Sequence, residues 1–544
     1  MSVPSSVEPN AECYPMSALP NITRLYADYL AMADAPAAVR NWYGAEPLGS
    51  GWMGRDVAIS HPGAIADALR TQSLSFGAGD AALKNIELLR GGARAVVTGQ
   101  QVGLFGGPLL TILKAATAIA RAKEATVATG IAHVPIFWLA TEDHDLAEVD
   151  QVKLLSKHAV ETLRIGLADA ANPVGGITLG PEIEKSLNQA SELLAYAPVC
   201  DLLRECYTPE ATLGSAFARF MARLFASHGL IVMDAAGPDF HALGKSVFRA
   251  AIERAAELEE ALIARTHELA SGGYHAQVLV KPGSSLLFLI DNATGVRNLL
   301  RRVADNLWKA GTHTYSTAEL LGILDSKPQR LSPNALLRPV FQDTILPTAA
   351  YVGGPAEIAY FAQSEVLYRA ILGRLTPVLP RLSGTLIEPA IATIMAKDEV
   401  SLEDIFNAKT VDALAHLLGA RAMPIEEKRK LAAVGTAMDD ELIALTTYLA
   451  AVDESLGRSA LVSASKMRYQ MNRLRRMAAT FEVQKQASLT KHAEAMVLHL
   501  FPGAHPQERV IAGAYFLAQC GDGLIDRLVH EAGEMCLGHS VIRA

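Results

Sequence analysis

Residues 94–108, RAVVTGQQVGLFGGP, join a short apolar run to a turn rich in glycine. A helical pattern follows from about Pro108 to Glu124, and a second apolar run, HVPIFWLA, occupies residues 133–140. Strand, turn, helix and strand in this order predict a βαβ unit with two parallel strands. Residues 229–234, GLIVMD, have the composition of a further buried strand. The first half of the chain therefore predicts the α/β class, with a doubly wound parallel sheet.

Two long segments interrupt this pattern and are expected to be insertions. Residues from about 151 to 228 are rich in Glu and Leu and predict helices. In the segment from about 240 to 330, residues 240–270 predict one amphipathic helix, and residues 276–291 predict a β-hairpin. We therefore expect residues 1–395 to form one core that includes both insertions.

The C-terminal region changes character at about residue 425. Apolar residues recur there at alternating spacings of three and four, in two series: Leu442, Leu445, Leu449, Val452 and Leu456, then Met467, Met471, Leu474, Ala478 and Phe481. This spacing predicts an antiparallel coiled-coil hairpin over residues 425–495 that reverses at Gly457. Residues 396–424 would connect it to the core, and residues 496–544 are expected to pack back on the core.

Composition excludes several classes of protein. The 544-residue chain has 49 Lys and Arg against 57 Asp and Glu, a net charge of −8, whereas nucleic-acid binders need a basic face. No apolar run is long enough to predict a membrane span, and the N-terminus lacks the pattern of a secretion signal. We expect a soluble cytoplasmic protein whose cysteines are reduced thiols: Cys13, Cys200, Cys206, Cys520 and Cys536.

The first candidate site is the glycine-rich turn itself. A turn between a strand and a helix lies at the edge of the sheet where α/β proteins bind ligands, and the helix start offers N–H donors to an anion. The candidate residues for substrate are Thr98, Gln100 and Gln101, and those for a cofactor are Gly99, Gly103, Gly106, Gly107 and Lys114. The alternative is a tight structural turn with two buried glutamines.

The second candidate site follows the next strand, in residues 141–150, TEDHDLAEVD. Carboxylates around one imidazole can ligate a metal, orient a general base or bind an amine. Asp143, His144 and Asp145 are therefore the candidate catalytic residues. The alternative, a helix cap followed by acidic residues in the first turn, explains about half of these acids.

The third candidate site lies in residues 332–360, where polar residues alternate with Pro and Gly. This composition is typical of loops held rigidly over a site. Asn334, Arg338, Tyr351 and Glu357 are the candidate substrate-binding residues. Each of them alone could equally be a cap, a turn or a core hydrogen bond.

Four segments together resemble the family of the bacillithiol biosynthesis cysteine-adding enzyme, BshC. They are TGQQVGLFGGP, FWLATEDHDLAEVD, SPNALLRPVFQDTILPTAAYVGGPAEIAY and LFPGAHPQER. The resemblance implies a Rossmann-like parallel-sheet core with connecting insertions, and a coiled-coil hairpin that forms a homodimer. It also implies a carbon–nitrogen ligase that adds L-cysteine to glucosaminyl-malate in the last step of bacillithiol biosynthesis.

Amide formation from a free carboxylate is uphill in water, so we expect ATP with Mg²⁺ to activate cysteine as an acyl-adenylate or an acyl-phosphate. The glycine-rich turn would hold malate or phosphate, and the residues around His144 would bind an ammonium group or act as the base. No tightly bound metal is expected. Two alternatives stay open: a metal-dependent hydrolase or transferase that uses residues 142–145, and a non-catalytic dimeric scaffold.

Overall fold

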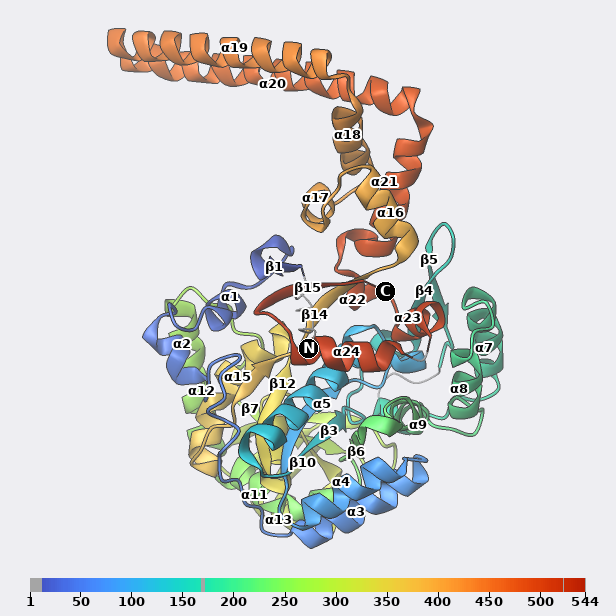
Figure 1. The fold of residues 1–544 in the computed structure, drawn as a ribbon. Coiled ribbons are helices and arrows are strands. Elements are labelled where there is room, and N and C mark those ends of the chain that lie inside the picture. Colours follow the sequence, from blue (N-terminus) through green and yellow to red (C-terminus); the bar gives the residue numbers. More distant parts are fainter. Residues whose placement is uncertain (1–11, 168–171, 522, 544) are drawn as a thin grey trace, which may run out of the picture. The chain divides into compact units, whose positions relative to one another are not determined.

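The computed structural model describes residues 12–167, 172–521 and 523–543, which divide into two compact units (Figure 1). The core unit consists of Met1–Thr385 and Glu508–Ile542. The helical unit consists of Leu386–Gln507 with the last two residues. The boundaries that the sequence placed near residues 395, 425 and 495 all fall inside the helical unit.

The core unit is built on a parallel sheet of five strands in the order β13-β12-β2-β3-β6. Its strands are β2 (Arg94–Gln100), β3 (His133–Leu139), β6 (Ile231–Asp234), β12 (Thr348–Gly353) and β13 (Val378–Pro380). The chain adds β3 and β6 on one side of β2 and then returns to add β12 and β13 on the other side. This order confirms the predicted α/β fold and places the reversal of strand order between β2 and β12.

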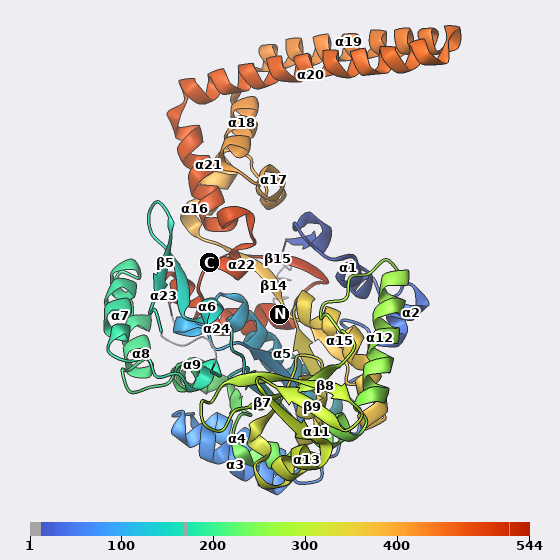
Figure 2. The ribbon, with the colours of Figure 1, turned by 180° about the vertical axis from the view of Figure 1, so that it is seen from behind.

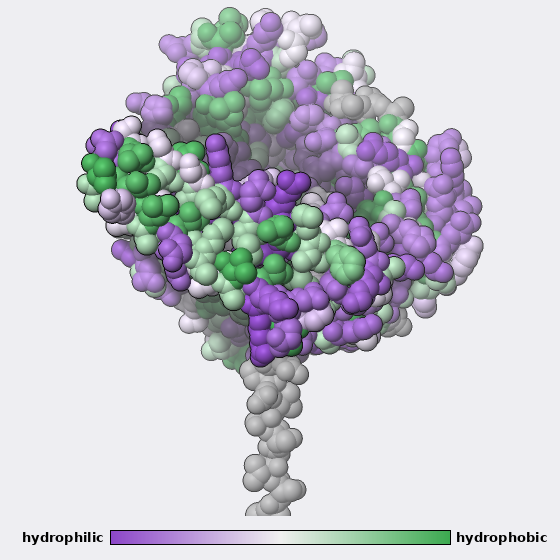
Figure 3. Space-filling model, turned by 90° about the horizontal axis from the view of Figure 1, so that it is seen from above, coloured by the Kyte–Doolittle hydropathy of each residue, from purple (hydrophilic) through white to green (hydrophobic). Residues whose placement is uncertain are grey.

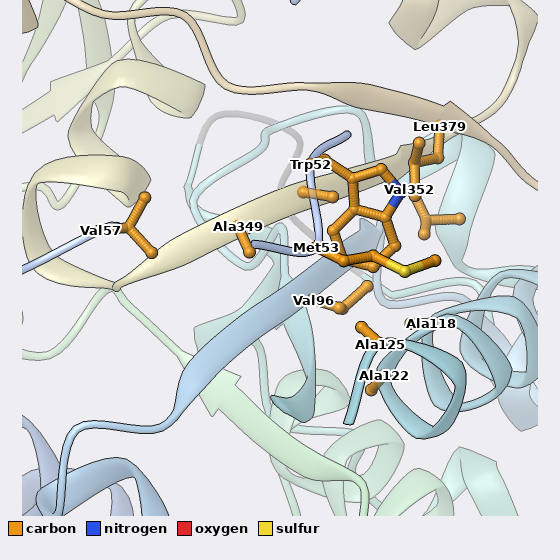
Figure 4. Close-up of a cluster of buried hydrophobic side chains, with 11 residues drawn as sticks. Trp52, Met53, Val57, Val96, Ala118, Ala122, Ala125, Ala349, Val352 and Leu379 are labelled. Carbon is orange, nitrogen blue, oxygen red and sulfur yellow. The ribbon is translucent and has the colours of Figure 1, made fainter. Parts of the chain in front are cut away.

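Helix α5 (Leu110–Thr129) packs along β2, β3 and β12 and is buried on nearly all sides. Its Ala118, Ala122 and Ala125 repeat at helical spacing and face the sheet in one apolar cluster with Trp52 and Val96 (Figure 4). Small side chains let a helix lie close to a sheet, and close packing of this kind stabilises the interior. The predicted βαβ unit is therefore the centre of the fold.

Most of the other elements of the core unit are helices or short strands outside this sheet. They are α1 (Arg24–Leu30), α2 (Ala37–Trp42), α3 (Pro62–Ser75), α4 (Asp80–Arg90), α6 (Leu146–Val149), α13 (Thr317–Ser326), α14 (Arg338–Ile345), α15 (Pro355–Leu367), β9 (Leu307–Ala310), β10 (His313–Ser316), α22 (Gln507–Val510), α23 (Gly513–Cys520) and α24 (Leu524–Gly533).

The first insertion begins with a β-hairpin that the sequence did not predict. Strands β4 (Gln151–Leu155) and β5 (Val160–Arg164) are antiparallel, and helices α7 (Glu182–Leu193), α8 (Val199–Cys206) and α9 (Leu213–Leu224) follow. The prediction of helices alone was wrong because the two strands are only five residues long each. So short an apolar pattern does not separate a strand from a helix.

The second insertion departs from its prediction in two places (Figure 2). The single helix is divided into α10 (Pro238–Leu243), α11 (Lys245–Glu253) and α12 (Ala255–Ser271). Strand β7 (Ser284–Ile290) pairs with the later β8 (Arg297–Ala304) and β11 (Leu331–Pro333), so residues 276–291 contain one strand instead of a hairpin. The Pro-Gly turn at residue 282 precedes this strand and does not join two strands.

A separate sheet in the order β1-β15-β14 joins the two ends of the chain. Strands β1 (Cys13–Pro15) and β15 (Gly538–Arg543) are antiparallel, β14 spans Ser383–Ile387, and a disulfide links Cys13 to Cys536. The prediction of reduced thiols was therefore wrong for these two cysteines. Their separation of 523 residues gives no sequence signal of their proximity. Cys200, Cys206 and Cys520 form no disulfide within the described part of the chain.

The helical unit contains α16 (Pro389–Lys397), α17 (Leu402–Ala408), α18 (Val411–Ala422), α19 (Ile425–Val452), α20 (Glu454–Lys485) and α21 (Ala487–Leu500). Helices α19 and α20 lie side by side as the predicted hairpin (Figures 1 and 2). The chain reverses at Asp453, whose side chain caps α20 by accepting a hydrogen bond from the Leu456 amide at 2.9 Å. The predicted reversal at Gly457 was wrong, because Gly457 packs inside α20 against Ala450.

The seam of this hairpin also differs from the prediction. Of the two predicted apolar series, only Leu442 and Met471 are buried, and the other buried positions on these two helices include small residues such as Gly435, Ala464 and Ala479. Six predicted seam residues are exposed: Leu445, Val452, Leu456, Met467, Leu474 and Phe481. The contact between the helices therefore depends largely on small residues, which a search for large apolar residues does not detect.

No helix in the described part of the chain has the length and apolar composition of a membrane span. The face drawn in Figure 3 mixes hydrophilic and hydrophobic residues.

Candidate functional site at the carboxyl edge of the parallel sheet

The three predicted site segments meet at the carboxyl edge of the parallel sheet. Strand β2 continues into the glycine-rich turn, β3 into residues 141–145, and β12 into Gly354 and Glu357. Strand order reverses between β2 and β12, and open α/β sheets bind ligands at the carboxyl edge beside such a reversal. The fold therefore identifies this edge as the candidate site without any use of motif spacing.

Lys114 is held by three acceptors between β2 and β12. Its ammonium donates to the Gly99 carbonyl at 2.8 Å and to the Gln100 side chain at 2.9 Å, and it forms an ion pair with Glu357. Burial lowers the pKa of Lys114. Burial also works against the Glu357 carboxylate, but Lys114 and the Gly354 amide hold the pKa of Glu357 below its ordinary value. The pair is therefore a buried contact that closes the end of the two strands.

Arg338 and Tyr351 extend this network. Tyr351 donates to Glu357 at 2.5 Å, and the Arg338 guanidinium donates to the Tyr360 hydroxyl at 2.8 Å while lying 5.5 Å from the centre of the Tyr351 ring. Burial raises the pKa of Tyr351 well above its ordinary value, so its hydroxyl stays a donor. Residues predicted from separate segments thus form one connected network.

Two predicted substrate-binding residues have structural partners. The buried Thr98 hydroxyl donates to the Val352 carbonyl at 2.9 Å and so links β2 to β12. The Asn334 side chain accepts from the amides of Leu336 and Leu337, both at 3.0 Å, and thereby supports the chain just before α14. The contacts of Thr98 and Asn334 are therefore structural hydrogen bonds within the protein, as the alternative interpretation of these residues expected.

The amides of the glycine-rich turn are largely hydrogen-bonded within the protein. Gly103 donates to the Gln101 carbonyl at 3.1 Å, Gly106 to the Tyr207 hydroxyl at 3.0 Å, and Gly107 to the Leu104 carbonyl at 3.0 Å. The Leu109 amide at the start of α5 donates to Ile511 at 2.9 Å. These groups are not the free donors that the sequence suggested.

Close packing explains two of the glycines. A Cβ atom on Gly99 would lie 2.8 Å from the Trp138 carbonyl, and one on Gly106, whose φ is +85°, would lie 2.5 Å from the Phe220 ring. Buried Phe105 itself has φ 51°. Non-glycine residues adopt this conformation at a cost of about 1 kcal/mol or more, so surrounding contacts must hold the turn in place.

The acidic segment after β3 forms a second polar group at the same edge. Gln101 donates to Asp143 at 2.8 Å, and Asp143 accepts from the His144 amide at 2.8 Å. The half-exposed His144 ring lies 3.4 Å from the Arg297 guanidinium, measured from its Nδ1 atom. Asp145 caps α6 by accepting from the Glu148 amide at 3.3 Å. His144 and Asp145 are thus the exposed members of this group, and Asp145 fills the capping role.

Sequence reasoning missed the residues that support this segment from behind. Buried His241 lies 3.2 Å from the Glu142 carboxylate, which raises the pKa of His241 although burial works against its charge. Asp234 ends β6 and accepts from the Thr141 hydroxyl at 2.5 Å. Burial raises the pKa of Asp234. His241 lies in a mostly apolar helix and gives no motif signal.

A buried ionic network at the end of β13 was also missed. The Arg381 guanidinium donates to both carboxylate oxygens of Glu508, at 2.9 and 2.5 Å, and Glu508 also accepts from the Gly384 amide at 3.0 Å. Burial opposes the charge, but Arg381 lowers the pKa of Glu508 to about 2. His539 contacts the hydroxyl of Ser383 at 2.8 Å, and burial lowers its pKa to about 4.

A cavity of about 190 Å³ opens beside the glycine-rich turn. Its lining includes Gln100, Gln101, Gly103, Gly107, Gln151 and Arg509. The sequence predicted the first four of these. Gln151 and Arg509 come from β4 and from the C-terminal segment, and only the folded chain brings them to the turn. This cavity is the candidate binding site for a small ligand.

Within the described residues, no three His, Cys, Asp or Glu side chains are placed to hold a metal ion. A metal centre based on residues 142–145 would need such a group of ligands. The residues present therefore do not support the metal-dependent alternative.

The parallel sheet, its reversal point and the polar edge define the chain as a Rossmann-like α/β protein with a helical hairpin. Two family models match it, the N-terminal Rossmann-like domain of bacillithiol biosynthesis BshC over residues 18–382 and the C-terminal coiled-coil domain of BshC over residues 384–544. The chain belongs to the BshC family.

Relatives named "Putative cysteine ligase BshC" are similar over nearly their whole length. The protein of Koribacter versatilis is 43% identical, with 98% of this chain and 99% of that protein covered. The protein of Solibacter usitatus is 36% identical, with 97% and 99% covered. The protein of Salinibacter ruber is 31% identical, with 99% and 100% covered.

Proposed function

We propose that this chain is a carbon–nitrogen ligase that joins the carboxyl group of L-cysteine to the amine of glucosaminyl-malate, the last step of bacillithiol biosynthesis. The observation that carries the proposal is the polar cavity at the end of β2, beside the reversal of strand order. The names of full-length relatives support the class of reaction.

ATP with Mg²⁺ is the co-substrate that we propose, because it supplies the activation that a free carboxylate lacks. The cavity of about 190 Å³ is smaller than the roughly 300–1,000 Å³ of typical ligand pockets. It therefore fits a phosphate group or an amino acid better than a whole nucleotide. Gln100 and Gln101 face it with side-chain amides that can donate to an oxyanion or accept from an ammonium group.

His144 is the residue that we propose to handle the proton of the attacking amine. Its ring is half-exposed, and it lies beside Asp143, the acid that also binds Gln101 of the cavity. A neutral imidazole can accept a proton near neutral pH, whereas a buried, fully paired group cannot do so without losing its partner. Asp143 would keep the ring in place.

The experiment is product formation by the purified full-length chain. We expect the cysteine adduct of glucosaminyl-malate, detected by mass spectrometry, only when cysteine, glucosaminyl-malate, ATP and Mg²⁺ are all present. His144→Asn should lower kcat about 100-fold or more, as the loss of a general base does. His158→Asn, an exposed histidine on the β4–β5 turn, is the matched control and should keep full activity. No adduct from folded protein under any nucleotide condition would contradict the proposal.

We also propose that the chain forms a homodimer through α19 and α20. Large apolar side chains are exposed along both helices, among them Leu445, Leu474 and Phe481. A second copy would cover them and remove them from water. Sedimentation should give twice the chain mass for the native protein and the monomer mass for the Leu474→Lys/Phe481→Lys variant. An unchanged mass would exclude this surface.

A cytoplasmic location fits a biosynthetic enzyme and completes the proposal. Disulfides are rare in cytosolic proteins, which makes the Cys13–Cys536 bond a direct check of the location. Alkylation and mass spectrometry of the protein taken from cells would measure the fraction of this pair that is reduced. A fully oxidised pair would argue for a different compartment.

A further inference from the structure

Arg509 is an exposed cation without an ion pair in the described structure, and it lies near two buried cations that are paired. Its side chain lines the cavity beside the glycine-rich turn. Across residues 12–167, 172–521 and 523–543, no carboxylate forms an ion pair with Arg509 and no acceptor takes a hydrogen bond from its guanidinium. Lys114 and Arg381, in contrast, are neutralised by Glu357 and Glu508.

The backbone on the N-terminal side of Arg509 is fixed by its neighbour. Glu508 accepts hydrogen bonds from the two terminal guanidinium nitrogens of Arg381, from the Ser383 hydroxyl at 3.2 Å and from the Gly384 amide at 3.0 Å. The exposed fraction of both partner side chains is only 3%. A residue next to such an anchor has little freedom to move away from the cavity.

The backbone on the C-terminal side is fixed as well. The Ile511 carbonyl accepts from the Leu109 amide at 2.9 Å, and the Ala512 amide donates to the Lys153 carbonyl at 2.9 Å. The Gly513 amide donates to Gly107 at 3.1 Å. Arg509 is therefore positioned between two anchors, one of which is the glycine-rich turn itself.

The remaining polar groups of the cavity give it a positive balance. Lys153 is a second cation without an ion pair in the described structure, and Glu148 is the one acid among the residues that line the cavity. Gln100, Gln101 and Gln151 add amide groups. Two cations against one acid, together with amide donors, favour an anionic ligand.

We propose that Arg509 binds a small multivalent oxyanion of a substrate in this cavity. Its planar guanidinium can hold two oxygen atoms of a carboxylate or a phosphate at once. On the proposed function, which this inference extends, the oxyanion comes either from the malate part of glucosaminyl-malate or from the phosphates of ATP. Both sources share the same chemistry and both would fit the volume.

Direct binding tests the site without any need for activity. Calorimetry of the native full-length protein is carried out with L-malate in one arm and with tripolyphosphate in the other. We expect one of the two anions to bind, and the arm that gives a saturable heat change identifies the source. Binding of neither anion at millimolar concentration would overturn the proposal.

Two variants assign the binding to this residue. Arg509→Gln should lower the affinity for the anion about tenfold or more, the usual loss for a charge-assisted hydrogen bond. Arg301→Gln removes an exposed arginine of β8 outside the cavity and should bind the anion as the native protein does. Equal binding by Arg509→Gln and the native protein would assign the anion to another place and contradict the proposal.

Kinetics then separate this inference from the proposed ligase activity. In an active preparation, Arg509→Gln should raise KM for the substrate that supplies the oxyanion about tenfold while changing kcat less. If the protein makes no adduct but binds the anion through Arg509, the proposed anion site stands and the proposed ligase activity is contradicted. If the protein is an active ligase and Arg509→Gln leaves its KM values unchanged, the ligase activity stands and the proposed anion site is contradicted.

Discussion

Two groups of charges at the same sheet edge differ in whether they are satisfied. At the ends of β12 and β13, Arg381 and Glu508 form a buried bidentate pair, and Lys114 is enclosed by oxygen acceptors. At the end of β2, Arg509 faces an open cavity without such a partner. A paired buried charge holds the fold together and is costly to recruit for a ligand, whereas an exposed, unpaired charge such as Arg509 is available for binding. Pairing is thus a better guide to role here than residue type or position.

The largest effect is expected from breaking the buried pair. Arg381→Met leaves Glu508 charged and without its guanidinium, which should lower the free energy of unfolding by about 3–5 kcal/mol. Thermal and urea unfolding measure the loss. The double variant Arg381→Met/Glu508→Leu removes both charges and should recover most of it. A double variant as unstable as the single one would show that packing, and not pairing, is what this contact provides.

The disulfide beside this network is expected to have the next effect. Cys13→Ser removes the bond between Cys13 and Cys536 and should lower the free energy of unfolding by about 2–4 kcal/mol under oxidising conditions. Unfolding with and without a reductant measures it. The reductant should shift the native protein and leave the variant unchanged. Equal stability of the two proteins without reductant would mean that the bond does not form.

The next largest effect is a dependence of stability on pH that is caused by His539. Its pKa is about 4 in the folded chain and about 6.5 in an unfolded chain, so the unfolded state binds more protons between these values. Stability should therefore fall by about 2 kcal/mol between pH 7 and pH 5 because of this residue. The pH dependence of unfolding should be shallower by that amount in His539→Asn.

This comparison of variants isolates His539 from the other titrating groups. His241 has a raised pKa, so its contribution has the opposite sign and is lost as the pH rises. Glu508, with a pKa of about 2, keeps its charge throughout this range. Identical slopes for the native protein and His539→Asn would show that the imidazole is not held neutral.

The smallest effect on stability is expected at the cavity. Arg509→Gln removes no ion pair of the described structure, so the free energy of unfolding should change by less than about 0.5 kcal/mol. Urea unfolding beside that of Arg301→Gln measures it. A loss as large as that of Arg381→Met would place Arg509 among the structural charges and remove the contrast between the two groups.

The sequence predicted the fold well where a pattern is local and large. The runs at residues 94–98 and 133–140 correspond to β2 and β3, and the turn between β2 and α5 was placed correctly. The β4–β5 hairpin was missed because two five-residue strands carry too little pattern. The seam of the hairpin was misplaced because Gly457 and Ala464 are too small to appear in an apolar series.

The candidate site shows the same limit in a different form. Motif reasoning found Gln100, Gln101, Lys114 and Glu357, because they lie in or close after the glycine-rich turns that follow β2 and β12. It did not find Arg381 or His241, because their roles depend on partners more than 90 residues away in the sequence. Arg509 lies in a segment that carries the family resemblance. Its position in the cavity follows only from the fold, which places it beside the glycine-rich turn.

The pairing of β1 with β15 has a consequence for how the chain is made. Cys13 lies opposite Ser540, and its disulfide spans 523 residues, so β1 finds its partner only after nearly the whole chain has left the ribosome. At ordinary rates of synthesis this delay is roughly 30–100 s. A circular permutant that joins the two ends by a short linker and opens the exposed turn at Asp305 and Asn306 would make β1 and β15 neighbours in the sequence. The pairing of β1 with β15, which otherwise forms last during synthesis, would then be a contact between neighbouring segments of the sequence.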